Sequence, residues 1–303
     1  MSEYLLTTQD LTKTYGRHNA IDHVSMHIPK GAVYGFIGRN GAGKTTLMKI
    51  IAGLSTQTSG SYELFGCSGA QMGAVREKVG CLIEAPGIYP DMTAFQNVKA
   101  KCLVRGVYNE GYVNELLQAV GLFDAGKKKA KDFSLGMRQR LGIAIALVGD
   151  PEFMVLDEPI NGLDPQGIVE VRETIHRLAI ERHITILISS HILDELAKIA
   201  THIGIIENGV LLKELSAQQL KDECAAKIEI VVDNIAAAMN VLHNMGITQF
   251  QQVNANQINV TERIDESAAV NKALVEAGIA VSKLNVSGEA LEDYYIRITG
   301  GAR

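Results

Sequence analysis

The sequence predicts an α/β protein with a buried parallel sheet, followed by a smaller α+β domain. Three short runs are almost entirely apolar rather than alternating, which is typical of strands that a parallel sheet buries on both faces. Each run ends in glycine or polar residues, and segments with a helical pattern lie between the runs. Ligands of such sheets bind at the carboxyl ends of the strands, so we expect the functional site there. The runs are Ala32–Ile37, Phe153–Leu156 and Ile184–Ile188.

The first predicted domain comprises residues 1–215. Its opening segment, Leu5–His27, alternates between apolar and polar residues, which indicates an antiparallel addition to the main sheet. Helices are expected where apolar residues recur at helical spacing, at Ala94–Arg105, Glu115–Val120 and Gly167–Arg182.

The rhythm of the chain changes near Leu215, and residues 216–303 are predicted to form a separate domain. Their order of strand, helix, strand, strand, helix and strand is the split βαβ pattern of ferredoxin-like folds. An amphipathic helix, Glu289–Ile298, is expected to follow. The six elements of the pattern are Lys227–Val232, Ile235–Asn244, Thr248–Val253, Gln257–Val260, Glu266–Ala277 and Val281–Val286.

Composition restricts the classes of function. The chain has 303 residues and a net charge of -5, and it lacks the basic patch that a nucleic-acid partner would require. Its four cysteines are scattered, which disfavours a disulfide framework or a zinc site and fits a reducing, cytoplasmic compartment. The longest apolar runs, such as Leu141–Gly149, fall far short of the roughly 20 residues that span a bilayer. We therefore expect no secretory signal and no membrane span.

The first polar segment follows the first apolar run and has the spacing Gly-x-x-x-x-Gly-Lys-Thr of the Walker A phosphate loop. Its backbone N–H groups and the start of the next helix would bind phosphates, Lys44 would reach the β- and γ-phosphates, and Thr45 would bind Mg²⁺. An ordinary glycine turn is the alternative, which the Lys-Thr pair after a strand disfavours. The expected ATP-binding residues here are Gly38, Arg39, Asn40, Gly41, Ala42, Gly43, Lys44, Thr45 and Thr46.

The second apolar run ends in two acids, which is a Walker B pattern. Asp157 would hold Mg²⁺, directly or through water, and Glu158 would polarise the attacking water. A solvated or helix-capping acid pair is the alternative. That alternative would be favoured if the acid pair stood alone. In a chain that also contains a phosphate loop, the Walker B interpretation is favoured.

The segment that precedes the second run resembles the signature motif of ATP-binding cassette (ABC) proteins. Ser134 and Gly136 match two of its positions, while Phe133, Leu135 and Met137 depart from it. Ser134 could also simply cap a helix. Three further motifs fit the family. The segment Asn161-Gly162-Leu163-Asp164 resembles the D-loop, with Asp164 as its acid. His191 resembles the switch histidine, and Tyr15 resembles the aromatic residue that stacks on adenine. The resemblance covers about Leu5 to Leu215.

One motif departs from the common family form. The resemblance implies a helical subdomain at about residues 85–148. Most cassettes carry glutamine where the catalytic part of the domain joins this subdomain. Here that position is Glu84, which resembles the branch of bacitracin-resistance and lantibiotic-immunity exporters. Glu84 could act in catalysis and bind Mg²⁺ as a charged oxygen ligand. It could also be a solvated loop acid.

The resemblance implies the energy-coupling ATPase of an exporter for a peptide antibiotic or bacteriocin-like compound. Its cofactors would be ATP and Mg²⁺, and its catalytic residues Glu158, His191 and Glu84. Two cassettes, most simply two copies of this chain, would enclose two ATP molecules, with Ser134, Leu135, Gly136 and Met137 facing the nucleotide of the other subunit.

The permease would be a separate membrane chain, with this subunit on the cytoplasmic face of the membrane. It would dock near residues 84–95, where Pro86, Ile88, Tyr89 and Met92 form an apolar groove or simply pack the helical subdomain. Two other functions stay open. One is a soluble cassette ATPase without a permease, for example in cluster assembly. The other makes the C-terminal domain a small-molecule sensor, although no ligand constellation supports it.

Overall fold

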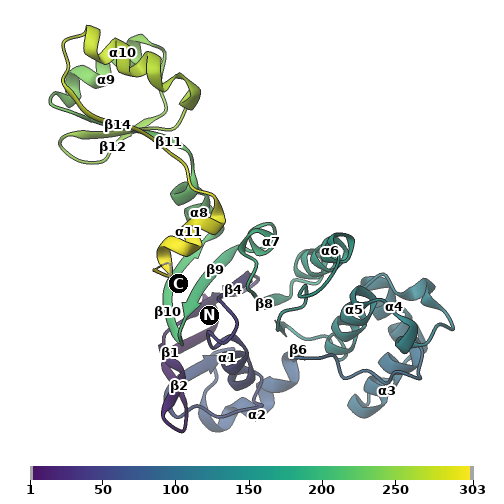
Figure 1. Ribbon diagram of the computed structural model, residues 1–303. Helices are drawn as coiled ribbons and strands as arrows, with labels where there is room; N and C mark the ends of the chain where they lie inside the picture. The colour runs from purple at the N-terminus through teal and green to yellow at the C-terminus, as the bar shows by residue number, and fades with distance from the viewer. Residues whose placement is uncertain (1–2, 301–303) are drawn as a thin grey trace. The chain divides into compact units, whose positions relative to one another are not determined.

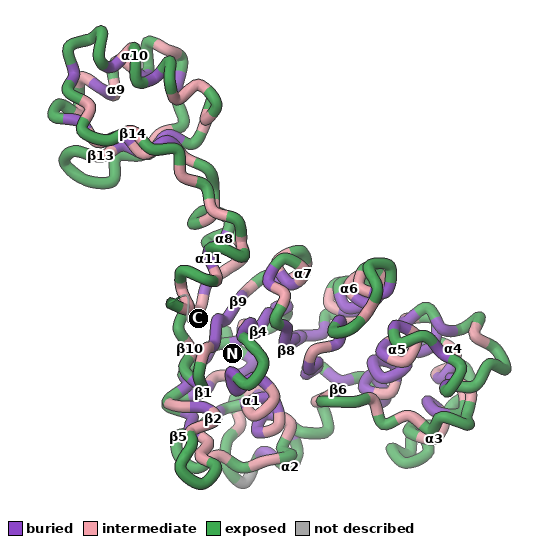
Figure 2. The backbone as a smooth tube through the Cα atoms, in the orientation of Figure 1, coloured by how far each residue is buried: buried purple, intermediate pink, exposed green. Residues whose placement is uncertain are grey.

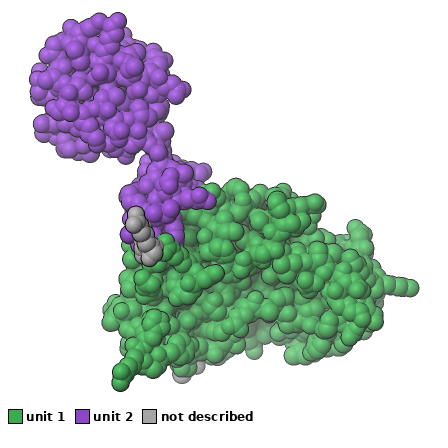
Figure 3. All heavy atoms as spheres, viewed as in Figure 1, with its two compact units in different colours: residues 1–217 green, residues 218–303 purple. Residues whose placement is uncertain are grey.

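The computed structural model describes residues 3–300 and divides into two compact units, Met1–Ala217 and Gln218–Arg303 (Figure 3). The first unit contains two sheets, one antiparallel and one mainly parallel, with helices around them (Figure 1). The second unit contains a separate antiparallel sheet. Across residues 3–300, no helix is both long and apolar enough to cross a membrane.

The antiparallel sheet of the first unit is organised by its long first strand. β1 pairs with β3 through its first half and with β2 through its second half, while β5 pairs with it on both sides of a register shift after Gln9. This agrees with the antiparallel addition predicted for the start of the chain. The strands are β1 (Tyr4–Tyr15), β2 (His18–Val24), β3 (His27–Pro29) and β5 (Ser59–Leu64).

The parallel sheet has the strand order β10-β9-β4-β8-β7-β6, and only β10 runs antiparallel to its neighbour. β4, β7 and β8 are buried at every position, as their largely apolar runs predict, and the polar residues at the two ends of β8 are buried as well (Figure 2). The sequence did not reveal β6, β9 or β10; β6 has only four residues and contains a glycine, and β9 and β10 contain charged residues. The strands are β4 (Val33–Ile37), β6 (Val79–Leu82), β7 (Phe153–Leu156), β8 (Thr185–Ser190), β9 (His202–Glu207) and β10 (Val210–Ser216).

Helices surround this sheet, and three of them, α3, α4 and α5, gather beyond the β6 edge (Figure 1). α4 begins five residues before the predicted helix, because Asn109 caps it by accepting a hydrogen bond from Tyr112 N. Four short 3₁₀ turns join these elements. The helices are α1 (Lys44–Ile51), α2 (Met72–Val75), α3 (Ala94–Arg105), α4 (Glu110–Ala119), α5 (Leu135–Ala146), α6 (Pro165–Glu181) and α7 (Leu193–Ala197).

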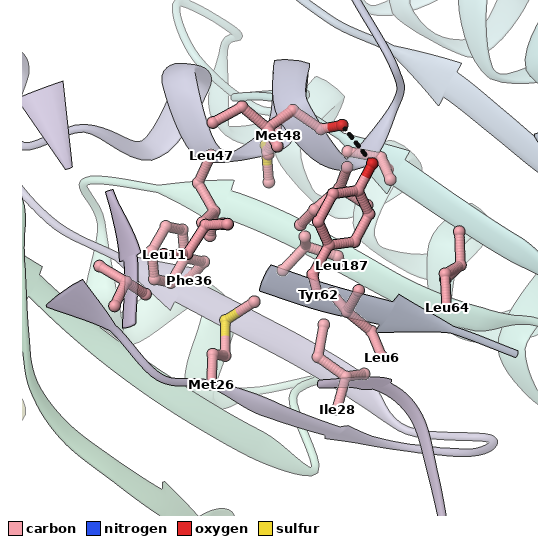
Figure 4. Close-up of a cluster of buried hydrophobic side chains, with 14 of the residues drawn as sticks. Leu6, Leu11, Met26, Ile28, Phe36, Leu47, Met48, Tyr62, Leu64 and Leu187 are labelled. Carbon is pink, nitrogen blue, oxygen red and sulfur yellow. Dashed lines mark hydrogen bonds between the residues drawn. The ribbon is translucent and has the colours of Figure 1, made fainter. Parts of the chain in front are cut away.

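The main core of the first unit lies between the antiparallel sheet, α1 and one face of the parallel sheet. Leu6, Met26, Phe36, Leu47 and Leu187 are completely buried there; Met26 lies between β2 and β3, and the others come from β1, β4, α1 and β8 (Figure 4). Each such side chain contributes about 1.5–3 kcal/mol by leaving water. The core therefore fixes α1, and with it the preceding loop, against β4 and β8.

The second unit has the strand order β12-β13-β11-β14, antiparallel throughout, which is the arrangement of ferredoxin-like folds. Ile228, Ile230 and Val232 alternate along β11 and form a core together with residues of α9 and α10. The split βαβ order predicted from the sequence is thus present. The elements are α8 (Ala217–Cys224), β11 (Lys227–Val232), α9 (Ile235–Asn244), β12 (Phe250–Gln252), β13 (Gln257–Val260), α10 (Ser267–Glu276), β14 (Val281–Ser287) and α11 (Leu291–Ile298).

Candidate active site

The loop between β4 and α1 lies tightly against its neighbours. A Cβ atom on Gly38 would lie 2.5 Å from Ile206 O, and one on Gly43 would lie 2.4 Å from Ala20 O. Gly43 also has φ of +108°, which side chains rarely tolerate. Glycine is therefore required at both positions for the loop to take this path.

The loop lines a hollow of about 190 Å³ at the start of α1. The first backbone N–H groups of a helix have no partner within the helix and carry partial positive charge, so they favour an anion. The hollow is smaller than the roughly 300 Å³ or more that encloses a whole small ligand, so it suits phosphate groups. Its lining residues are Ala20, Asn40, Gly41, Gly43, Lys44, Thr45, Thr46 and Glu158.

The Lys44 ammonium is buried, with a side-chain exposure of 5%. Its Nζ donates to Gly38 O at 2.5 Å and to Arg39 O at 3.1 Å, and it lies 3.0 Å from Glu158 Oε1. An ammonium has three donors, and a buried charge is costly unless it is paired. The loop carbonyls and Glu158 therefore hold the charge of Lys44 at the edge of the hollow.

Asp157 follows β7 and lies beside α1. Its Oδ2 accepts a hydrogen bond of 2.7 Å from Thr45 Oγ1, and its Oδ1 accepts one of 2.7 Å from Ser189 Oγ. The sequence placed Thr45 and Asp157 as Mg²⁺ ligands, and the fold brings these two side chains together although they are 112 residues apart.

Glu158 comes next and adopts a positive φ of 48°. Its Oε2 lies 2.9 Å from His191 Nδ1, and its Oε1 faces Lys44. Oε1 is buried, and among residues 3–300 no donor is oriented to form a hydrogen bond with it. A buried acceptor in that state suits a ligand or water that supplies the donor. Glu158, His191 and Lys44 thus form one contiguous cluster.

The residues at this cluster fit Mg²⁺. A hydroxyl and a carboxylate are hard oxygen donors, and Mg²⁺ commonly binds one or two carboxylates together with substrate phosphates and water. No group of three or more His, Cys, Asp or Glu side chains able to hold a metal occurs among the described residues. Thr45 and Asp157 would bind the ion together with bound phosphates.

Among the described residues, Glu84 is bonded to Lys49 and not to Thr45 or Asp157. Its Oε1 accepts a 2.5 Å hydrogen bond from Lys49 Nζ, and this bond raises the pKa of Lys49. Lys49 lies one helical turn after Thr45 on α1, so the Glu84 carboxylate is near the cluster. Glu84 has φ of +64°, an uncommon conformation for a residue with a side chain. Its predicted metal and catalytic roles stay predictions.

The signature residues lie elsewhere in the first unit. Ser134 caps α5 by accepting a hydrogen bond from Met137 N, and Asp164 caps α6 by accepting one from Gly167 N. A Cβ on Gly136 would lie 3.6 Å from Gly167 Cα, so the two helix starts adjoin. The signature residues and Asp164 are absent from the described lining of the phosphate-sized hollow.

Tyr15 ends β1 and is 53% exposed. Lys13 Nζ lies 5.1 Å from its ring centroid, and Tyr15 does not line the phosphate-sized hollow. An exposed ring is accessible for stacking, and its predicted contact with adenine stays a prediction.

A second hollow of the first unit, of about 560 Å³, is larger but lacks the predicted site residues. It lies where β7 and β8 begin, and its lining includes Glu115 and Arg182, which form an ion pair of 2.6 Å. Ligands of open α/β sheets bind at the opposite edge, where strands end. We therefore assign the candidate site to the smaller hollow.

Two residues that contact the predicted site residues were missed in the sequence. Lys49 carries no signal beyond its position on α1. Ser189 does carry one, because it ends the third apolar run at the carboxyl edge of the sheet. A polar residue at that edge could have been singled out on the same grounds as Asp157.

The sequence matches known proteins along its whole length. A family model described as ABC transporter matches residues 21–161. The bacitracin transport ATP-binding protein BcrA of Bacillus licheniformis is 40% identical over 299 residues, which are 98% of each chain. The lantibiotic transport ATP-binding protein SrtF of Streptococcus pyogenes is 46% identical over 210 residues, which are 69% of this chain and 90% of that protein.

Solved structures share the fold of the first unit. CbiO1 from Clostridium perfringens, described as part of an ABC transporter complex, has a TM-score of 0.66 and 24% identity. The match covers 73% of this chain and 92% of that one. At this level of identity the likeness shows the fold, an ABC ATPase cassette.

Proposed function

Because the chain belongs to the family of ABC transporter ATP-binding proteins, we propose that it binds and hydrolyses ATP to power a separate permease that exports a peptide antibiotic. One observation carries the proposal: Lys44, Thr45 and Glu158 line one phosphate-sized hollow, and Asp157 and His191 contact Thr45 and Glu158 respectively.

In the proposed mechanism, the loop backbone and Lys44 bind the phosphates, and the exposed ring of Tyr15 stacks on adenine. Thr45 and Asp157 hold Mg²⁺, which when bound neutralises charge on the phosphates. The phosphates compete with Glu158 for Lys44. Binding therefore frees the Glu158 carboxylate to orient the attacking water, while His191 steadies it from the other side.

The catalytic test is Glu158→Gln, which keeps the size of the side chain but removes its charge. We expect ATP binding to persist, turnover to fall to background and an ATP-bound dimer to accumulate. Steady-state phosphate release and size-exclusion chromatography with ATP measure this. Unchanged turnover would remove Glu158 from the reaction.

The peptide-antibiotic substrate is supported by the full-length similarity to the bacitracin transport protein, which includes the C-terminal unit. The permease is proposed to dock at the loop before α3, where Tyr89 and Met92 are exposed, while Pro86 lies against α5. The subunit would then lie on the cytoplasmic face of the membrane as a dimer of identical chains.

Purification from detergent extract tests the transport role. We expect a polytopic membrane protein to copurify, and bacitracin to stimulate ATP hydrolysis of the reconstituted complex. A purely soluble complex would contradict this role and favour a cassette ATPase without a permease. Loss of the chain should also increase bacitracin sensitivity of its host, and Glu158→Gln should not restore resistance.

A further inference from the structure

We propose that Ser189 is a positioning residue whose single hydroxyl holds Asp157 and Glu158 in one fixed arrangement. The Mg²⁺ ligand and the residue that orients water would then be set by the same group. This inference rests on the proposed ATPase function. It adds a residue that belongs to none of the sequence motifs named above.

The hydroxyl makes two hydrogen bonds of complementary direction. Ser189 Oγ donates to Asp157 Oδ1 at 2.7 Å and accepts from the backbone N–H of Glu158 at 2.8 Å. A serine hydroxyl has one donor and two acceptor sites, so it can make both bonds together. Ser189 is completely buried, so bulk water has no access to replace either bond.

The register of the sheet explains why Ser189 meets the two acids. β7 and β8 are parallel neighbours, with Leu156 opposite Ile188, so Asp157 and Ser189 occupy the next level. Side chains alternate along a strand, so Ser189 shares its face with Leu187. Leu187 points into the core beneath α1 (Figure 4), and that face directs Ser189 towards the helix that carries Thr45.

On Asp157, the two oxygens have different partners. Ser189 occupies Oδ1, so Oδ2 is turned towards Thr45, where both would bind Mg²⁺. Partners of metal-binding carboxylates commonly orient them in this way, and their loss costs about 10- to 100-fold in metal affinity or activity. Without the hydroxyl, the Asp157 carboxylate can rotate.

On Glu158, the bond restrains the backbone rather than the side chain. The residue has φ of +48°, a conformation that persists for side chains other than glycine only where the surroundings enforce it. The hydrogen bond from Glu158 N to Ser189 supplies such a restraint at the peptide. The carboxylate is consequently directed between Lys44 and His191.

The test is Ser189→Ala in the full chain. Nucleotide affinity is measured with Mg²⁺ and with EDTA, and steady-state kinetics give kcat and KM. We expect affinity in EDTA to stay within about two-fold of wild type, because the phosphate loop is intact. The gain in affinity from Mg²⁺ should fall, and kcat should drop about 10- to 100-fold with little change in KM.

Thr185→Val is a matched control for the loss of a buried hydroxyl. Thr185 lies at the other end of the same strand, is 1% exposed, and its hydroxyl accepts a 2.8 Å hydrogen bond from Gly31 N. We expect this variant to lower thermal stability but to keep the Mg²⁺ dependence and kcat of wild type. A general effect of removing a hydroxyl from β8 would instead alter both variants alike.

Three results would overturn the inference. The first is a Ser189→Ala variant with wild-type kcat and Mg²⁺ dependence. The second is an equal loss of nucleotide affinity in EDTA and in Mg²⁺, which would show that the hydroxyl stabilises the whole nucleotide pocket rather than the Mg²⁺ ligand. The third is the same effect in Thr185→Val. Failure of the proposed function would differ, because wild-type protein would then neither bind nor hydrolyse ATP.

Discussion

At the scale of single residues, the candidate site is a set of ionisable side chains that each have a polar partner. Lys44 contacts Glu158, Glu158 contacts His191, and Asp157 receives hydrogen bonds from Thr45 and Ser189. Buried charges are stable only when they are paired in this way. A triphosphate that enters the cluster must therefore replace Glu158 as the partner of Lys44.

Lys44→Ala tests this exchange. The change removes the cation and leaves the Glu158 carboxylate beside the hollow with His191 as its remaining partner, so the carboxylate should repel phosphate. Hydrogen bonds to charged groups contribute about 1.5–3 kcal/mol, so we expect nucleotide affinity to fall about 10- to 100-fold. Titration with a fluorescent ATP analogue measures this.

Lys78→Ala is the control, since Lys78 is exposed and pairs with Glu152 away from the hollow. It should leave affinity unchanged. Full nucleotide affinity in Lys44→Ala would contradict the assignment of the phosphate loop.

At the scale of elements, α3 holds the proposed permease-docking loop through one buried amide. Asn97 Oδ1 accepts from Tyr89 N at 2.7 Å, and its Nδ2 donates to Tyr89 O at 3.1 Å and Thr93 O at 2.9 Å. Thr93 and Gln96 form a capping box that starts the helix beside this loop. The exposed Tyr89 and Met92 are thus presented by a loop that is tied to a helix.

Asn97→Ala should loosen the loop. It leaves the Tyr89 backbone groups without their side-chain partner, which costs about 1–3 kcal/mol when such groups are buried. We expect faster hydrogen exchange at the Tyr89 amide and weaker binding to the permease, with unchanged ATP affinity of the separate subunit.

Asn109→Ala provides the comparison, because Asn109 caps α4 and bonds Tyr112 N instead. It should accelerate exchange at Tyr112 and not at Tyr89. Unchanged exchange at Tyr89 in Asn97→Ala would show that the amide does not order this loop.

At the scale of the whole molecule, the first unit carries one phosphate loop and one signature segment, and the described lining of the loop's hollow lacks the signature. Leu135 is the first residue of α5 and is 39% exposed, beside the D-loop residue Gly162. This arrangement is compatible with a signature that acts on the nucleotide of a second copy.

Leu135→Glu tests that dimer in the Glu158→Gln background. An acid in the first turn favours the helix, so α5 should stay folded. Its charge would face the phosphates bound by the second copy, and we expect the ATP-dependent dimer to be lost. Light scattering after size-exclusion chromatography measures the mass.

Leu135→Gln has nearly the same shape without the charge and should still form the dimer. Equal dimerisation of the Glu and Gln variants would place the signature away from the phosphates of the second copy.

The sequence by itself determined the parallel strands β4, β7 and β8, the split βαβ order of the second unit, the phosphate loop and the acids that follow β7. These follow from local patterns: largely apolar runs, glycine spacing and polar residues at strand ends. Only the tertiary structure decided that Ser189 bridges Asp157 and Glu158, that Lys49 holds Glu84, and that the strands lie in the order β10-β9-β4-β8-β7-β6. The physical reason is that these contacts join residues far apart in the chain. Their partners are set by strand register and by the packing of α1 on the sheet, which local sequence does not encode.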